Sequence, residues 1–236
     1  MSTTALFLAA GSGSRMQGSV DDKVLTLLNG TPVFIHSIQA FLQSKVADRF
    51  TIVHRDEPQR IALEEALKSI DIGTTLISWV TGGKERQDSV LNALIQQEAS
   101  CKYVFIHDCA RPLITAEAIQ ALHAALQRNN AVVLAHPVMD TIKRIPTNDT
   151  IEKVMLEDLD RNRLWAMETP QAFDYADILS AYQNVKANKL AITDDTAAAA
   201  TIGIHTTLVP NTKPNLKITT PQDLLYAEWL LQQSTR

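Results

Sequence analysis

A segment rich in glycine and serine is the first part of the chain that could bind a phosphate. It spans residues 9–16 and contains Gly11, Gly13 and Arg15, with Lys23 a short distance beyond. Glycine lets the backbone turn sharply, so that successive N–H groups can point at one anion. The two cations add positive charge. We expect this loop to hold the phosphates of a nucleotide, although a plain Gly/Ser turn would have the same composition.

Two familiar nucleotide motifs do not fit this loop. The dinucleotide fingerprint G-x-G-x-x-G needs glycine where Met16 stands, and no acidic residue lies near position 31 to bind a ribose. The P-loop pattern fails as well, because Gly18 is followed by Ser19 instead of lysine. The loop therefore indicates a different class of nucleotide-binding protein.

A second loop, residues 82–90, begins with the glycine pair Gly82-Gly83 and leads into a predicted helix. The first N–H groups of a helix have no internal partners and are available to an anion. Ser89 could point its hydroxyl at a base or a phosphate. An ordinary turn with Asp88 as the helix cap would explain the same residues.

A third loop, residues 107–112, places Asp108 directly after an apolar run. A carboxylate at the tip of a parallel strand can hold a metal–nucleotide complex or a ribose hydroxyl. Arg111 could anchor Asp108 or a phosphate, and the alternative is a purely structural pair between the two. We expect His107 to be structural. Residues 137–143 form a fourth loop of the same kind.

The elements that must position these loops alternate between short apolar runs and helical patterns. We expect strands at residues 5–9, 50–53, 74–80, 103–106 and 131–135, and helices at 32–44, 58–69, 88–97 and 115–128. Continuous apolar strands between helices indicate a parallel sheet covered on both faces. The sequence therefore predicts an α/β, Rossmann-like fold with a mostly parallel twisted sheet. Ligands of such folds bind at the carboxyl ends of the strands.

The segment from about 138 to 168 interrupts this alternation. Polar and apolar residues alternate over 141–145, a polar turn follows at 146–150, and residues 151–155 alternate again. This pattern predicts a projecting β-hairpin arm. Because a lone two-stranded ribbon is marginal in water, we expect the arm to form a homodimer. Residues 215–219, which include Lys217, also look like an alternating strand.

Length and composition limit the class of protein. The chain has 236 residues, which suits a single domain, and its net charge of −4 argues against a nucleic-acid partner. No apolar run approaches the roughly 20 residues of a membrane span, and the N-terminus does not resemble a signal peptide. Cys101 and Cys109 flank an apolar run, so we expect them to be reduced and at least partly buried in a cytoplasmic protein.

The ordered motifs together carry a family resemblance. They are residues 8–16 with Lys23, then 82–90, 107–112, 137–143, 160–165, 169–171, 193–195 and 215–219. From about residue 5 to residue 230, the chain resembles the 2-C-methyl-D-erythritol 4-phosphate cytidylyltransferase family of sugar-phosphate nucleotidyltransferases. The resemblance implies CMP transfer from CTP to methylerythritol phosphate, with Mg²⁺ bound mainly through the CTP phosphates and no metal ligand from the protein.

The resemblance also implies roles for individual residues. Catalysis falls to Arg15, Lys23, Arg161 and Lys217, with Arg161 supplied by the arm of the partner subunit. Methylerythritol phosphate is held by Asp140, Thr141 and Thr169. The nucleotide is bound by Ala9, Ala10, Gly11, Gly13, Gly82, Ser89, Asp108, Cys109 and Arg111.

The chemistry implied needs no general base. A phosphate monoester has a second pKa of about 6 and is largely dianionic at neutral pH, so its oxygen is already a nucleophile. The barrier is the approach of two anions, which positioned cations and N–H groups must lower. Arg15 and Lys23 would stabilise the transition state of an in-line attack. Arg161 and Lys217 would align the nucleophile.

Two positions depart from the family pattern. Asp22 precedes Lys23 where the family usually has proline, after a loop one residue longer, and Cys109 stands where the family has alanine. Asp22 could weaken the field at Lys23 or simply point to solvent.

Three other functions remain open. A ribitol 5-phosphate cytidylyltransferase would share the fold and most loops. An inactive nucleotide-binding regulatory protein would have little need of all four cations. A nicotinamide-dependent oxidoreductase is disfavoured by the broken fingerprint.

Overall fold

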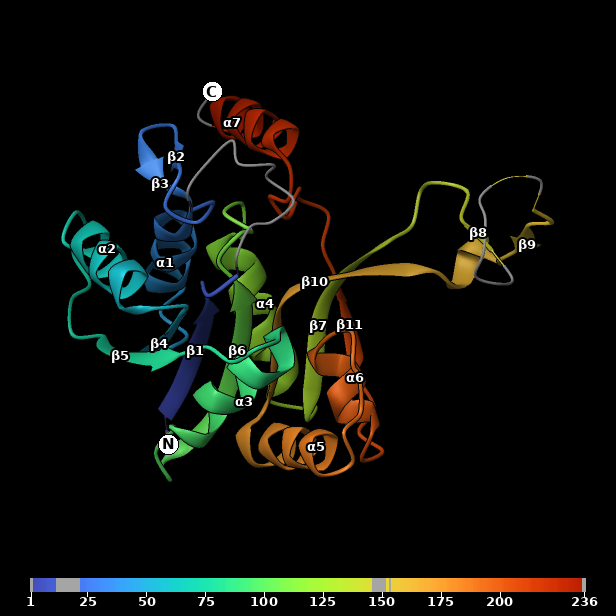
Figure 1. Ribbon diagram of the computed structural model, residues 1–236, viewed down its shortest axis with the longest axis horizontal. Coiled ribbons are helices and arrows are strands. Elements are labelled where there is room, and N and C mark those ends of the chain that lie inside the picture. Colours follow the sequence, from blue (N-terminus) through green and yellow to red (C-terminus); the bar gives the residue numbers. More distant parts are fainter. Residues whose placement is uncertain (1, 12–21, 146–151, 153, 235–236) are drawn as a thin grey trace.

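A seven-stranded sheet forms the centre of the molecule. The computed structural model describes residues 2–11, 22–145, 152 and 154–234. The strand order is β11-β7-β10-β6-β1-β4-β5 (Figure 1). The strands are β1 (Ser2–Leu8), β4 (Arg49–His54), β5 (Leu76–Thr81), β6 (Cys101–Asp108), β7 (Ala131–Pro137), β10 (Trp165–Asp174) and β11 (Thr207–Pro210). All neighbouring pairs are parallel except those of β10, which runs antiparallel to both β6 and β7. The predicted α/β fold is confirmed.

Helices cover both faces of the sheet, because side chains of each strand point alternately to either side. In β1, Phe7 packs with the helices α1 (Val33–Ser44), α2 (Glu57–Leu67) and α4 (Ala116–Leu126). Leu6 packs on the other face, with α3 (Arg86–Ile95), α5 (Tyr175–Ala187) and α6 (Asp195–Ala200). The ring of Phe7 lies edge-on to two other buried rings, at centroid distances of 5.0 and 5.1 Å.

The helix starts explain small differences from the predicted boundaries. Thr115 caps α4 by accepting a hydrogen bond from the Ala118 N–H. The cap of α3 is Glu85, not Asp88. The two carboxylates form a capping box, in which each accepts the other residue's backbone N–H. Pro32 lies in the short strand β3 (Thr31–Pro32), which pairs with β2 (Leu27–Leu28), so α1 begins one residue later than predicted.

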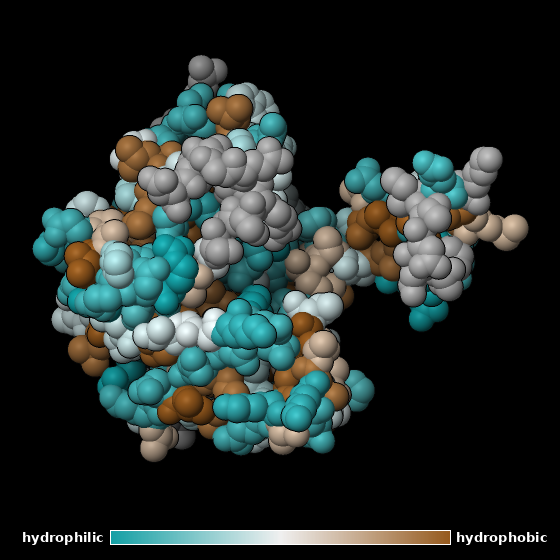
Figure 2. Space-filling model, viewed as in Figure 1, coloured by the Kyte–Doolittle hydropathy of each residue, from teal (hydrophilic) through white to brown (hydrophobic). Residues whose placement is uncertain are grey.

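The arm leaves the sheet between β7 and β10 and projects far from the body (Figure 1). Its ladder is short: β8 (Lys143–Arg144) pairs with β9 (Glu157–Asp158). The predicted second strand at 151–155, part of which lies outside the described residues, is therefore placed too early. Opposite charges explain the register, because Lys143 faces Asp158 and Arg144 faces Glu157. Brown apolar residues gather on the arm in Figure 2, and Met155 is 87% exposed.

The C-terminal part contains a further correction. Residues 215–219 form no strand, although the Ile218 N–H donates to the Ala110 carbonyl at 2.7 Å and fixes the segment beside the end of β6. Helix α7 (Pro221–Ser234) follows. Both cysteines are unpaired and buried, as predicted. Within the part of the chain that the structure describes, no helix is long and apolar enough to cross a membrane.

Candidate active site

A cleft of about 540 Å³ opens at the carboxyl ends of β1 and β6, where ligands of parallel sheets bind. Segments that are distant in sequence form its walls: the end of β1, residues 23–24, Arg55 just after β4, the loop before α3 with its first turn, the end of β6, and Lys217 with Thr219. Of the residues predicted from the sequence, it brings together Ala9, Ala10, Gly11, Lys23, Ser89, Asp108 and Lys217.

Two glycines let the loop before α3 lie against the end of β1. A Cβ on Gly82 would come within 2.7 Å of the Ala10 Cβ, and one on Gly83 within 2.2 Å of the Asp88 Cβ. The Ser89 hydroxyl bridges two backbone groups of this loop. It accepts from the Gly83 N–H at 2.9 Å and donates to the Glu85 carbonyl at 3.1 Å. The Ser89 hydroxyl thus shapes the cleft wall, besides lining it.

Asp108 is the charged centre of the cleft. One carboxylate oxygen accepts from Lys217 Nζ at 2.6 Å and the other from Arg86 Nε at 3.2 Å. Its backbone N–H donates to the Thr169 hydroxyl at 3.0 Å. Burial by itself would raise the pKa of Asp108, but the charges of Arg86 and Lys217 outweigh burial and hold that pKa well below 3.8. Asp108 is therefore ionised at any physiological pH, and it fixes the position of Lys217.

Arg86 is a site residue that sequence reasoning did not single out, although it lies within the motif 82–90. Its guanidinium forms two hydrogen bonds of 2.8 Å to Asp195, which is fully buried. Tyr182 donates to the same carboxylate. Burial opposes the charge of Arg86, yet Asp195 and Asp108 raise its pKa well above the ordinary value. Arg86 thus links the cleft to a buried carboxylate in the first turn of α6.

Lys23 and its acidic neighbour Asp22 face different groups. Lys23 lines the cleft, and its ammonium donates to the Ile218 carbonyl at 3.5 Å. The Asp22 carboxylate accepts from Gln59 at 2.6 Å and from Arg55 at 3.3 Å. The expectation that Asp22 simply points to solvent is wrong, because its carboxylate is only 10% exposed and bonds to Gln59 and Arg55.

Several predicted residues lie behind the cleft surface. Cys109 is fully buried in the core. His107, also buried, hydrogen-bonds to the hydroxyls of Ser37 and Thr169, and burial lowers its pKa to about 3, in keeping with a structural role. Arg111 donates to the Asn215 carbonyl at 2.7 Å and forms no ion pair with Asp108 in the described part of the chain.

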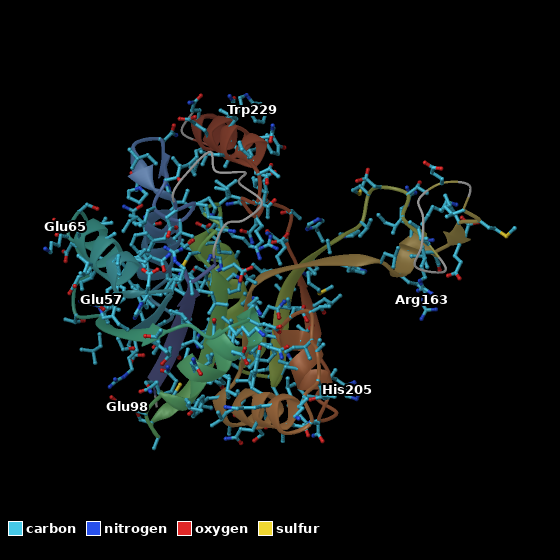
Figure 3. The ribbon with its side chains drawn as sticks, viewed as in Figure 1. Glu57, Glu65, Glu98, Arg163, His205 and Trp229 are labelled. Atoms are coloured by element: carbon cyan, nitrogen blue, oxygen red, sulfur yellow. The ribbon has the colours of Figure 1, made fainter. Side chains whose placement is uncertain are left out.

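The remaining predicted residues lie elsewhere. Asp140, Thr141 and Arg161 are exposed on the arm, where Arg161 Nη1 donates to the Met139 carbonyl at 3.1 Å. Arg163, labelled in Figure 3, marks the short 3-10 turn that carries Arg161, at the arm and well away from the central sheet. Gly13 and Arg15 lie outside the described residues.

Comparisons with known proteins agree over the whole chain. A family model described as 2-C-methyl-D-erythritol 4-phosphate cytidylyltransferase matches residues 3–233. Proteins of that name from Bacillus mycoides and Synechococcus elongatus are 36% and 37% identical over 228 residues, which is 97% of this chain in both cases and 97% and 95% of the relatives.

Solved structures give the same result. A 4-diphosphocytidyl-2C-methyl-D-erythritol synthase from Anaerococcus prevotii superposes with a TM-score of 0.82 at 27% identity, covering 98% of each chain. A 2-C-methyl-D-erythritol 4-phosphate cytidylyltransferase from Francisella tularensis has a TM-score of 0.79 at 26% identity, covering 98% of this chain and all of that one.

Proposed function

The chain belongs to the 2-C-methyl-D-erythritol 4-phosphate cytidylyltransferase family, and we propose that the cleft around Asp108 is where it performs the family's reaction. The enzyme transfers CMP from CTP to 2-C-methyl-D-erythritol 4-phosphate, in isoprenoid biosynthesis. The products are 4-diphosphocytidyl-2-C-methyl-D-erythritol and pyrophosphate. The observation that carries the assignment is the meeting of Lys23 and Lys217 with the Ala10–Gly11 backbone in one cleft.

The arrangement suits a reaction between two anions. The substrate phosphate attacks the α-phosphate of CTP in line, and pyrophosphate leaves. Lys23, together with Arg15, stabilises the charge that develops on the α-phosphate. Lys217 holds the attacking phosphate, and its hydrogen bond to Asp108 orients it before substrate arrives. Positioned cations of this kind need no reorganisation during the reaction, which is why they lower the barrier.

Mg²⁺ is part of the proposal. The cleft offers the carboxylate of Asp108, but both of its oxygens already bond to cations. Among the described residues, no group of three or more histidine, cysteine, aspartate or glutamate side chains could hold a metal ion. A site with so few protein ligands fits a cation that binds chiefly to the triphosphate, as Mg²⁺ often does. When bound, Mg²⁺ would neutralise charge on the phosphates.

The arm is proposed to complete the cleft of a second subunit in a homodimer. Asp140, Thr141 and Arg161 are exposed on it, and it extends away from its own cleft (Figure 1). Exposed apolar side chains such as Ile142 and Met155 suit a surface that a partner covers.

Mixing two inactive variants tests this part directly. If Arg161 serves the partner's cleft, a Lys23→Ala subunit and an Arg161→Ala subunit together form one intact cleft per heterodimer. Co-refolding equal amounts should restore about a quarter of wild-type turnover, since half of the dimers are mixed and each has one intact cleft of two. No recovery in a mixture that sedimentation shows to be dimeric would contradict the proposal.

The reaction itself is tested by pyrophosphate release. We expect release from CTP with methylerythritol phosphate, and little with ribitol 5-phosphate or with ATP, GTP or UTP. Lys23→Ala should lower kcat by about 10²- to 10³-fold without changing the melting temperature. Lys68→Ala removes a surface lysine that pairs with Glu65 and serves as the control. Equal turnover of ribitol phosphate, or near-normal kcat in Lys23→Ala, would contradict the assignment.

A further inference from the structure

A buried glutamine in the first turn of α2 connects the two described segments that flank residues 12–21. The side-chain nitrogen of Gln59 donates to the Ala9 carbonyl at 3.0 Å and to the Asp22 carboxylate at 2.6 Å. Ala9 lies just beyond β1, and Asp22 is the first described residue after the gap. One amide group therefore joins both sides of the glycine-rich loop.

The orientation of this amide is fixed. The side-chain oxygen of Gln59 accepts from the Arg55 N–H at 2.6 Å, and the Gln59 N–H donates to Asp56, the cap of α2. A backbone N–H can only donate, so the amide oxygen must face Arg55 and the amide nitrogen must face Ala9 and Asp22. Gln59 is only 3% exposed, so water offers little competition for these bonds.

Asp22 in turn fixes the backbone on either side of Lys23. Its carboxylate accepts from the Val24 N–H at 3.1 Å, and its carbonyl accepts from the Thr26 N–H at 3.0 Å. These bonds close a tight turn that contains Lys23. Arg55, which pairs with Asp56 at 2.8 Å, also lies 3.3 Å from the Asp22 carboxylate and adds a second donor to it.

We propose that Gln59 and Asp22 are positioning residues that hold Lys23 toward the α-phosphate of CTP. The family usually has proline immediately before this lysine, and proline restricts the backbone by its ring. In this chain a hydrogen-bonded carboxylate restrains the same position. The inference rests on the proposed role of Lys23. It adds that Gln59, which does not line the cleft, affects catalysis mainly through Lys23, besides holding the Ala9 carbonyl.

Two variants separate this role from folding. Gln59→Met keeps the length of the side chain but removes its donors and acceptor. Asp22→Asn keeps one acceptor oxygen for the Val24 N–H but turns an NH₂ group toward the donors of Gln59 and Arg55. Asp22 lies in a turn outside the sheet, so this second variant is expected to fold even if the first does not. The control is Gln97→Met, which removes a partly buried amide that bonds to Thr51, away from the cleft.

Hydrogen exchange tests the geometry without any assay of activity. In both variants the amides of Val24 and Thr26 should exchange at least about tenfold faster than in the wild type, because Gln59 no longer anchors Asp22 and the turn that Asp22 closes opens more often. The control should leave these amides unchanged. Wild-type exchange in Gln59→Met and Asp22→Asn would overturn the proposal.

A double-mutant cycle tests the coupling to catalysis. Gln59→Met should lower kcat by about 10- to 100-fold, as expected for a misplaced catalytic group. In the Lys23→Ala background the same change should cost less than about twofold, since the group it positions is gone. Multiplicative effects would show that Gln59 acts independently of Lys23 and would refute the proposal. If the wild type transferred no CMP to methylerythritol phosphate, the proposed function would fail, while the exchange measurement would still decide whether the turn is held.

Discussion

Removing Arg86 is expected to destabilise the protein and to make that loss depend on pH. Arg86→Met leaves Asp195, which is fully buried, without its only arginine among the described residues, and leaves Asp108 with Lys217 as its remaining ion-pair partner there. Breaking a buried ion pair from one side costs about 3–5 kcal/mol. Because the Arg86 side chain is 31% exposed, the lower end applies, and we expect a loss of about 3 kcal/mol at pH 8.

The loss should shrink as the pH falls. In the wild type the pKa of Asp108 lies below 3.8, so the ionised carboxylate stabilises the fold above pH 3.8 and loses that contribution only in stronger acid. Without Arg86, burial still raises the pKa of Asp108, and only the charges of Lys217 and Arg111 are left to oppose it. The difference in the free energy of unfolding between wild type and variant is therefore largest at pH 7–8 and decreases as the pH approaches 3.8.

Urea unfolding at pH 8 and pH 4.5, followed by tryptophan fluorescence, measures both effects. Arg49→Met is a matched control, because Arg49 is equally exposed, at 30%, but pairs with Glu98 in water. It should cost about 0–1 kcal/mol at both pH values. A loss below about 1 kcal/mol for Arg86→Met at pH 8, or a loss that does not change with pH, would refute the view that Arg86 balances buried charge.

Three further predictions concern the cleft. Lys217→Met should lower kcat/KM for methylerythritol phosphate by at least about 100-fold while titration calorimetry finds CTP affinity changed less than about threefold, because Lys217 is assigned to the attacking phosphate. Gly83→Ala should cost about 1–3 kcal/mol in thermal unfolding, because its Cβ would clash with Asp88 and open the capping box; Gly11→Ala, with nothing within 4 Å of the new Cβ, should cost less than about 0.5 kcal/mol. Chelation with EDTA should abolish turnover, with Mg²⁺ restoring it, yet shift the melting temperature of the CTP-free protein by less than about 1 °C, since the cation is proposed to bind through the nucleotide.

Local features of the sequence were enough to predict the parallel part of the sheet. Short apolar runs between helical patterns, such as 103–106, favour strands of a parallel sheet, and the glycine pair at 82–83 marks the loop that approaches β1. Strand β10 escaped prediction because it carries Glu168 and Gln171 in its buried stretch. A polar side chain can be buried there only if residues distant in sequence supply its hydrogen bonds. Glu168 accepts such bonds from Asn211 and Asn215 and is also bonded to His136.

The sequence predicted several of the residues that form the site, but not which of them bond to one another. Asp108 and Lys217 could be placed near a nucleotide from their motifs, whereas the hydrogen bond between them joins positions that only the fold brings together. The bonds from Arg86 to Asp195 and from Gln59 to Asp22 have the same character. Neither spacing nor propensity contains information on such pairs, because each depends on the strand order.

The point where the arm departs has a practical consequence for protein engineering. Pro137 lies opposite Trp165 in the ladder between β7 and β10, and the Val138 N–H donates to the Leu164 carbonyl at 3.0 Å. Facing Cα atoms of such strands are about 4.5–5.5 Å apart, a gap that a connection of two to five residues closes. Residues 138–164 can thus be excised, or exchanged for a graft of altered charge, without disturbing the register of the sheet. If the arm forms the proposed homodimer, grafts with complementary charges would give two distinct chains that recognise each other and not themselves.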